Sequence, residues 1–256
     1  MEVHSHYIRA RNCLFIEARL ASLYMDYYLH LQDHELRYTQ DQDRSLKEAL
    51  ACLLLHLVSR PREETVAWTM NFSDPAMNLF VTGNSRPGQI TGRIFTEEVR
   101  EARQNLFYSQ VQIPDGPSYN SMVKVEGRAI LSLVEQFYDQ SEQLPARFFE
   151  LPDERFCVVK GMPEADESWL RSLTLPEVEA LRETETVKFL ETRSYRFDCG
   201  CRIDRILPAL SGIASRDMEE LFGGQEVIRI TCPRCGLRYA LSRDMMKAFL
   251  ERENLE

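Results

Sequence analysis

The chain is 256 residues long, 44% hydrophobic and 28% charged, which is ordinary for a globular protein with one large or two unequal domains. Its 40 acidic and 31 basic residues give a net charge of −9, which disfavours a nucleic-acid partner. No apolar run approaches the roughly 18 residues of a membrane span, and the first residues are too polar for a signal peptide, so we expect a soluble cytoplasmic protein with no membrane partner.

The first part of the chain has helical patterns. Leu, Tyr and Met residues recur at helical spacing and predict a helix from Arg19 to Leu31. Polar residues predict a loop over 40–44. The capping box Ser45–Glu48 predicts that a second helix begins there and ends before Pro61. His56 lies in that helix with no ligand partner at metal spacing, which favours a structural role.

A meander of strands is predicted next. Residues 65–72 alternate apolar and polar side chains, the period of a half-buried strand. Further strands, separated by turn residues, are predicted at 79–82, 90–95, 106–113 and 121–125. A helix is predicted after Gly127, and we expect strands at 146–149 and 156–159 to close the same sheet.

The last third of the chain begins with a helix-rich stretch over 165–191. Its second piece, 177–186, is strongly charged and predicts a solvated linker helix. The remaining predicted elements are helices at 202–210 and 217–222, a strand at 227–230, and a Ser242-capped helix that ends the chain.

Four of the seven cysteines form two pairs, C-x-C at Cys199 and Cys201 and C-x-x-C at Cys232 and Cys235. The 30 residues between the pairs make a loop long enough to bring them together. Zinc binds four thiolates tetrahedrally. The sequence therefore predicts one zinc ion held by Cys199, Cys201, Cys232 and Cys235.

Neighbouring residues support a metal loop. Pro233 and Gly236 suit the turn around the second pair, Gly236 by permitting a positive φ. Two unrelated pairs of buried cysteines explain the pattern less well than a metal site does. A redox dithiol needs only one C-x-x-C pair, so it leaves the second pair unexplained. A structural disulfide framework is disfavoured, because the C-x-C pair is at the limit of bridging distance. The other three cysteines have apolar neighbours and are expected to pack in the core: Cys13, Cys52 and Cys157.

A four-thiolate site is also a candidate redox switch. An oxidant that links Cys232 to Cys235, or strains Cys199 onto Cys201, would remove the zinc ligands two at a time. Metal binding contributes about 10 to 16 kcal/mol to the folding of small domains, so loss of zinc should unfold the surrounding segment.

Sequence motifs of enzymes are not visible. The five histidines have no Ser/His/Asp or Cys/His context. Walker and dinucleotide-binding loops are also not recognised, because Gly83, Gly88 and Gly92 lie between strands rather than before a helix. We therefore expect a protein that is not an enzyme.

Two further strings accompany the cysteine pairs: Q-S-E-Q-L-P at 140–145 and G-M-P-E-A-D-E at 161–167. With them, the chain resembles the thirty-three-kilodalton heat-shock protein family, the redox-regulated holdase chaperones of the bacterial cytosol. The resemblance implies an ATP-independent holdase that binds unfolded client proteins and is a homodimer when active. It also implies that the four cysteines bind zinc in the reduced, inactive state, and that oxidants form two disulfides, Cys199 with Cys201 and Cys232 with Cys235.

The predicted fold class is α+β, in three parts. These are an N-terminal mixed sheet-and-helix core domain (1–164), a helical linker (165–195) and a small C-terminal zinc-binding α/β domain (196–256). The linker is short for the family, and 73–78 replaces a Gly-rich string, which suggests a divergent member with altered activation. Two alternatives remain: a non-switching zinc-binding adaptor or nucleic-acid module, and a thiol oxidoreductase.

Overall fold

The computed structural model describes residues 1–97, 99 and 103–253. The chain divides into two compact units, Met1–Asp198 and Cys199–Glu256. Both combine helices with antiparallel strands, so the predicted α+β class is confirmed. The functional division into core, linker and switch domains stays a prediction. Among the described residues, no helix has both the length and the apolar character needed to cross a bilayer.

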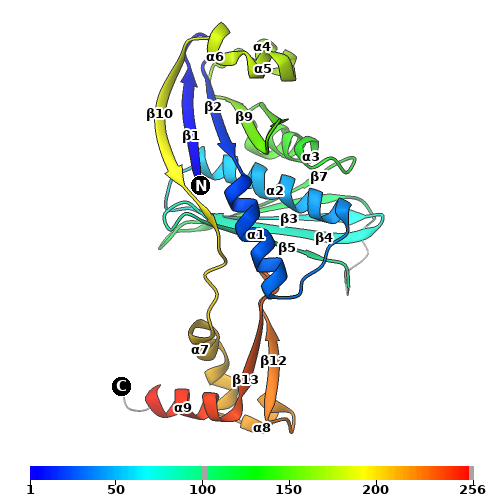
Figure 1. The fold of residues 1–256 in the computed structure, drawn as a ribbon, viewed down its shortest axis with the longest axis vertical. Coiled ribbons are helices and arrows are strands. Elements are labelled where there is room, and N and C mark those ends of the chain that lie inside the picture. The colour runs from blue at the N-terminus through cyan, green and yellow to red at the C-terminus, as the bar shows by residue number, and fades with distance from the viewer. Residues whose placement is uncertain (98, 100–102, 254–256) are drawn as a thin grey trace. The chain divides into compact units, whose positions relative to one another are not determined.

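One sheet of the first unit has five strands in the order β10-β1-β2-β9-β8, and all neighbours are antiparallel (Figure 1). The predicted meander did not include its first two strands, and it placed β8 and β9 in the other sheet. The strands are β1 (Glu2–Ile8), β2 (Cys13–Arg19), β8 (Ala146–Leu151), β9 (Arg155–Gly161) and β10 (Val187–Ser194).

The other sheet has six strands in the order β11-β5-β4-β3-β6-β7. All of its pairs are antiparallel except β11 with β5. The five strands predicted as a meander are confirmed here. The strands are β3 (Thr65–Ser73), β4 (Ala76–Asn84), β5 (Gln89–Phe95), β6 (Leu106–Gln112), β7 (Ser118–Lys124) and β11 (Arg196–Phe197).

Helix α2 (Gln40–Val58) is the centre of the first unit. Every residue from Ala49 to Val58 is buried, and a helix that is apolar on all sides must be covered on all sides. It contacts β4 and β5 of one sheet and β2 and β9 of the other, so it lies between the two sheets (Figure 1). The buried Trp68 ring packs 4.9 Å from that of His56.

The other helices of this unit cover its flanks. The predicted helix from Arg19 to Leu31 is α1 (Ala21–Asp33), in which Tyr24 and Tyr27 are buried and Tyr28 is exposed. The helix after Gly127 is confirmed as α3 (Ile130–Phe137), followed by a π-helical turn, η1 (Tyr138–Glu142). Three short helices follow β9: α4 (Glu167–Ser172), α5 (Leu175–Glu179) and α6 (Leu181–Thr184).

Three predictions about helices are wrong. The loop over 40–44 is the first turn of α2, because Thr39 and Gln42 form the capping box that was assigned to Ser45 and Glu48. The linker helix is short and not fully solvated, since Val178 and Leu181 are buried. Residues 187–191, expected to be helical, belong to β10, which pairs with β1 on both sides of a register shift at Leu190.

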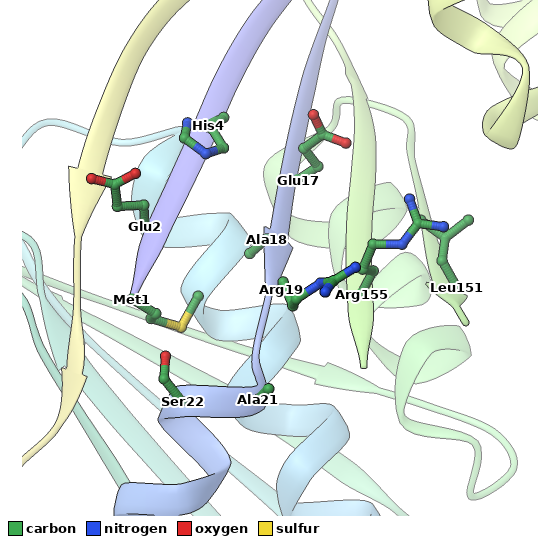
Figure 2. A pocket seen from close by; sticks show the side chains of 10 residues that line it. All are labelled: Met1, Glu2, His4, Glu17, Ala18, Arg19, Ala21, Ser22, Leu151 and Arg155. Atoms are coloured by element: carbon green, nitrogen blue, oxygen red, sulfur yellow. The ribbon is translucent and has the colours of Figure 1, made fainter. Parts of the chain in front are cut away.

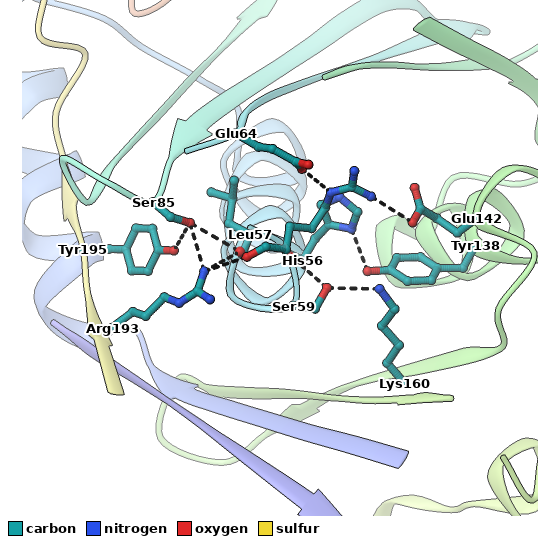
Figure 3. A network of polar contacts seen from close by, with 11 residues as sticks. His56, Leu57, Ser59, Glu64, Ser85, Tyr138, Glu142, Lys160, Arg193 and Tyr195 are labelled. Atoms are coloured by element: carbon teal, nitrogen blue, oxygen red, sulfur yellow. Dashed lines mark hydrogen bonds and ion pairs between the residues drawn. The ribbon is translucent and has the colours of Figure 1, made fainter. Parts of the chain in front are cut away.

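Arg193 fastens β10 to the end of α2 (Figure 3). Its Nη1 donates to the carbonyl oxygens of Leu57 at 3.1 Å and Arg60 at 2.9 Å, in the last turn of the helix and just beyond it. Its Nε donates to Glu191 at 2.8 Å, and its side chain is only 10% exposed. A cation is favoured here because carbonyls at a helix C-terminus lack helical partners and carry partial negative charge.

We expect Arg193→Ala to lower the free energy of unfolding of the first unit by about 2 kcal/mol, because buried charge-assisted hydrogen bonds are lost. Arg196→Ala is the matched control, since Arg196 is 65% exposed and its pair with Asp198 should contribute less than about 1 kcal/mol. Urea unfolding followed by tryptophan fluorescence measures this unit alone, because both tryptophans, Trp68 and Trp169, lie in it. Equal effects of the two substitutions would contradict the assignment.

Two buried histidines make the stability of this unit depend on pH. His6 lies between Phe15 and Phe189 and contacts Arg182, and burial lowers its pKa, with Arg182 adding and Glu17 opposing. His56 is fully buried against the Tyr138 hydroxyl, at 2.6 Å, and burial lowers its pKa well below the ordinary value.

Because both pKa values are lowered, the unfolded state binds protons near pH 6.5 that the folded state does not. The free energy of unfolding should therefore fall as the pH drops below about 6.5, by up to about 1.4 kcal/mol per pH unit for each histidine. His6→Gln keeps an acceptor for Arg182 and should reduce this slope. Urea midpoints between pH 5.5 and 7.5 test it, and an unchanged slope in His6→Gln would refute the role of His6.

Candidate metal centre

The second unit has a small hydrophobic core. Among the residues of this unit that the structure describes, the buried apolar side chains, apart from the cysteines, are Leu207, Ala214, Phe222, Leu241 and Met246. The predicted helices and the first strand are confirmed, but β13 is not among the predicted elements. The elements are α7 (Ile203–Ala214), α8 (Met218–Phe222), β12 (Val227–Thr231), β13 (Arg238–Ser242) and α9 (Arg243–Glu253).

The C-x-x-C pair lies in the tight turn between β12 and β13. The backbone N–H of Cys232 donates to the Leu237 carbonyl at 2.8 Å, and that of Gly236 donates to the Cys232 carbonyl at 2.9 Å. Gly236 has φ of 80°, so its predicted positive φ is confirmed. The hairpin register thus fixes where the sulfurs of Cys232 and Cys235 lie.

The C-x-C pair is shaped by the glycine between its cysteines. Gly200 has φ of 63°, a conformation that glycine adopts at little cost, and the turn brings both flanking sulfurs to one side. Arg205 of α7 donates to the Gly200 carbonyl at 2.9 Å. The sequence analysis assigned no role to Gly200 or Arg205, although a glycine between two cysteines could have predicted this turn.

The structure brings the four predicted cysteines together. Their sulfurs all lie within 4.8 Å of one another, with Cys199 Sγ 3.8 Å from Cys232 Sγ and Cys201 Sγ 3.5 Å from Cys235 Sγ. Four thiolates bound tetrahedrally at about 2.3 Å would stand about 3.8 Å apart, so the cluster has the dimensions of a metal site. Cys201 is partly exposed and the other three are buried.

Electrostatics within the cluster favour a cation. Contacts with the Cys199 and Cys235 sulfurs lower the pKa of Cys232, and the contact with Cys232 raises that of Cys199 to about 12. Contacts with Cys199 and Cys232 raise the pKa of Cys235. Thiolates this close repel one another, and a divalent ion between them would stabilise all four in the charged form. Such an all-sulfur donor set suits soft or borderline ions.

The three other cysteines are core residues, as predicted. Cys13, Cys52 and Cys157 are fully buried in the first unit. Burial raises the pKa of Cys13 to about 12 and raises those of Cys52 and Cys157 as well. Because the thiolate is the reactive form, these residues are poor targets for an oxidant.

A pocket of about 510 Å³ opens beside β1 and β2 (Figure 2), and three of its polar side chains have partners within the fold. Glu17 pairs with Arg182, and His4 Nδ1 lies 3.0 Å from Thr192 Oγ1. Arg155 donates to the Pro152 carbonyl at 3.3 Å. These contacts fix the charges in structural roles, so the cysteine cluster remains the stronger candidate site.

Comparisons with known proteins agree with one another. A family model described as Hsp33 protein matches residues 30–242. Two curated relatives are named 33 kDa chaperonin. The one from Nitrosococcus oceani is 27% identical over 155 residues, 52% of this chain and 54% of that protein. The one from Edwardsiella ictaluri is 28% identical over 158 residues, 50% of this chain and 53% of that protein.

These alignments mean that the chain spans about half the length of the curated relatives it matches. A crystal structure of the 33 kDa chaperonin (heat shock protein 33 homolog) from Thermotoga maritima matches with a TM-score of 0.75. That match covers 100% of this chain and 99% of the other at 14% identity, a level at which it shows the fold alone.

If the cluster holds a metal ion, Cys235→Ser should remove it and loosen the second unit, since its small core depends on the four-sulfur link. We expect the metal content to fall to near zero and amide exchange in β12 and β13 to rise steeply. Cys52→Ala is the control, because Cys52 lies in the core of the first unit. One ion still bound to Cys235→Ser, with unchanged exchange, would contradict this role.

Proposed function

The chain belongs to the Hsp33 protein family, whose members are chaperones rather than enzymes, and from this premise we propose a redox-regulated, ATP-independent holdase. Its zinc site is Cys199, Cys201, Cys232 and Cys235, and oxidation of that site increases its affinity for unfolding proteins. The observation that carries the proposal is the convergence of these four sulfurs within 4.8 Å.

The chemistry of the switch follows from the cluster. Zinc stabilises four thiolates, and thiolates are what a peroxide oxidises. Formation of each disulfide takes two electrons from two cysteines, reduces one hydrogen peroxide to two waters, and removes two zinc ligands. The proposed pairs are Cys199 with Cys201 and Cys232 with Cys235. Loss of zinc leaves the second unit with little to hold it folded, because few of its apolar side chains are buried.

The first unit offers a surface that such a change would uncover. Helices α4 to α6 bury Leu170, Leu173, Val178 and Leu181 against the sheet that contains Phe149. Release of the 167–184 segment would expose this apolar face, which suits the unfolded segments of client proteins. We therefore propose these clients as partners, a homodimer as the active form, and the cytoplasm as the location.

The path from the cysteines to that face runs through two strands. Both β10 and β11, which precede Cys199, are edge strands of their sheets. An edge strand has one neighbour, so it can detach without breaking the rest of its sheet. This placement supports a role for residues 187–198 as the segment that transmits unfolding.

One observation favours a second candidate, a zinc-binding adaptor that does not switch. The β10 strand pairs with β1 on both sides of a register shift at Leu190, and Arg193 fastens it to α2. These contacts hold the segment before Cys199 in place and oppose the spread of unfolding. A nucleic-acid version of this candidate is disfavoured by the net charge of −9.

Peroxide treatment should release about one zinc ion per chain and increase suppression of client aggregation. Zinc is measured with a chromogenic chelator, and aggregation by light scattering of a denatured protein diluted into buffer. The Cys199→Ser/Cys201→Ser double variant should lose the response to peroxide, whereas Cys52→Ala should keep it.

Three other results would separate the alternatives. A zinc-free, oxidised protein that leaves aggregation unchanged would refute the switch. Equal suppression before and after peroxide would indicate a chaperone that needs no oxidation. Catalysed reduction of insulin by the chain would indicate a thiol oxidoreductase instead.

A further inference from the structure

The C-terminal end of α1 carries two histidines one helical turn apart. His34 is the C-cap residue, and its backbone N–H donates to the His30 carbonyl at 3.2 Å, so the helical spacing is kept through both residues. Their ring centroids lie 4.6 Å apart, and both side chains are partly exposed. Residues four apart on a helix share one face, so both imidazoles can reach a common ligand.

The environment holds one of these rings in place. The His30 ring packs edge-on against Phe197, with centroids 5.3 Å apart. Phe197 in turn packs against Tyr27 of the same helix, with centroids 5.4 Å apart. A ligand side chain that is already ordered loses less entropy on binding, so this contact favours binding at His30.

The charge around the pair also suits a cation. The end of a helix carries partial negative charge, and Asp33 adjoins His34. Burial, together with His30, lowers the pKa of His34, while Asp33 opposes this shift. This shift favours the neutral form of the His34 imidazole, which is the form that binds metals.

We propose that His30 and His34 chelate a divalent transition-metal ion, with water completing its coordination. Imidazole nitrogens suit Zn²⁺, Ni²⁺ and Cu²⁺. This site differs in chemistry from the cysteine cluster and lies in the other unit of the chain. Because imidazoles do not form disulfides, an oxidant that joins the cysteines leaves the ligands of this site unchanged.

The test is a calorimetric titration of the reduced, zinc-loaded full chain with NiCl₂. We expect one equivalent of Ni²⁺ to bind without release of zinc, as monitored by a chromogenic chelator. His34→Gln and His30→Gln should each weaken binding by about 100-fold, because removal of one of two linked ligands abolishes chelation. His4→Gln, a histidine on β1, is the matched control and should bind as the native chain does.

A rescue separates chelation from any effect on folding. Asp26 is exposed on α1 and precedes His30 by four residues. The double variant Asp26→His/His34→Gln should therefore restore Ni²⁺ binding by placing a pair at 26 and 30. Binding that persists in His34→Gln, a double variant that fails to bind, or zinc release in step with Ni²⁺ uptake would each overturn the proposal.

One consequence rests on the proposed function. An ion that leaves the oxidised cysteines has a second, weaker site on the same chain, so peroxide-treated protein should retain more zinc than its His34→Gln variant after a brief desalting step. The Ni²⁺ titration uses reduced protein only. If the redox switch is refuted, the proposal of the histidine site is therefore unaffected. If the Ni²⁺ titration shows no binding, the proposal of the redox switch is likewise unaffected.

Discussion

Mutual repulsion among closely spaced thiolates is the constraint on which the second unit depends. Four sulfurs within 4.8 Å cannot all carry charge without a cation between them. The unit has few other buried contacts to replace that link. With a metal bound, as proposed, the folding of this unit, its metal occupancy and the oxidation state of its cysteines would form one linked equilibrium, in which a change in any of the three shifts the others.

The stability of the first unit has a different physical basis. Helix α2 lies between two sheets, and the cysteine on it, Cys52, is fully buried with a raised pKa. Stability of this kind comes from apolar burial and does not depend on a metal or on redox state. The proposed switch thus places its reactive sulfurs in the second unit, whereas burial keeps the sulfurs of the first unit unreactive, so in this proposal the first unit keeps its fold while the second changes.

The sequence predicted the features that depend on neighbouring residues, and it missed those that depend on residues far apart in the chain. Each cysteine pair was recognisable because its two cysteines are only a few residues apart. The alternation of apolar and polar residues in β3 is equally local, and it predicted a strand. The start of α2 was misplaced because two capping boxes compete, and only the one at Thr39 is used. The first part of β10 was predicted as helix because its partner strand, β1, lies almost the whole first unit away in sequence. Strand β9 was assigned to the meander because its actual partner, β2, is also distant in sequence.

The same distant pairing determines how far a change at the metal site can travel. In the proposed switch, loss of the metal acts on the second unit, and residues 187–198 are the part of the first unit that leads along the chain to Cys199. That segment is held by the contacts of Arg193, by the bond from the Met1 amino group to the Tyr195 carbonyl at 2.7 Å, and by the Asp198 N–H on the Ile90 carbonyl at 3.0 Å. Each such bond contributes about 0.5 to 3 kcal/mol. Together with the pairing of β10 to β1, these anchors are of the same order as the roughly 10 to 16 kcal/mol that a bound metal contributes to a small domain, so the strength of this segment determines how far a change in the second unit would spread.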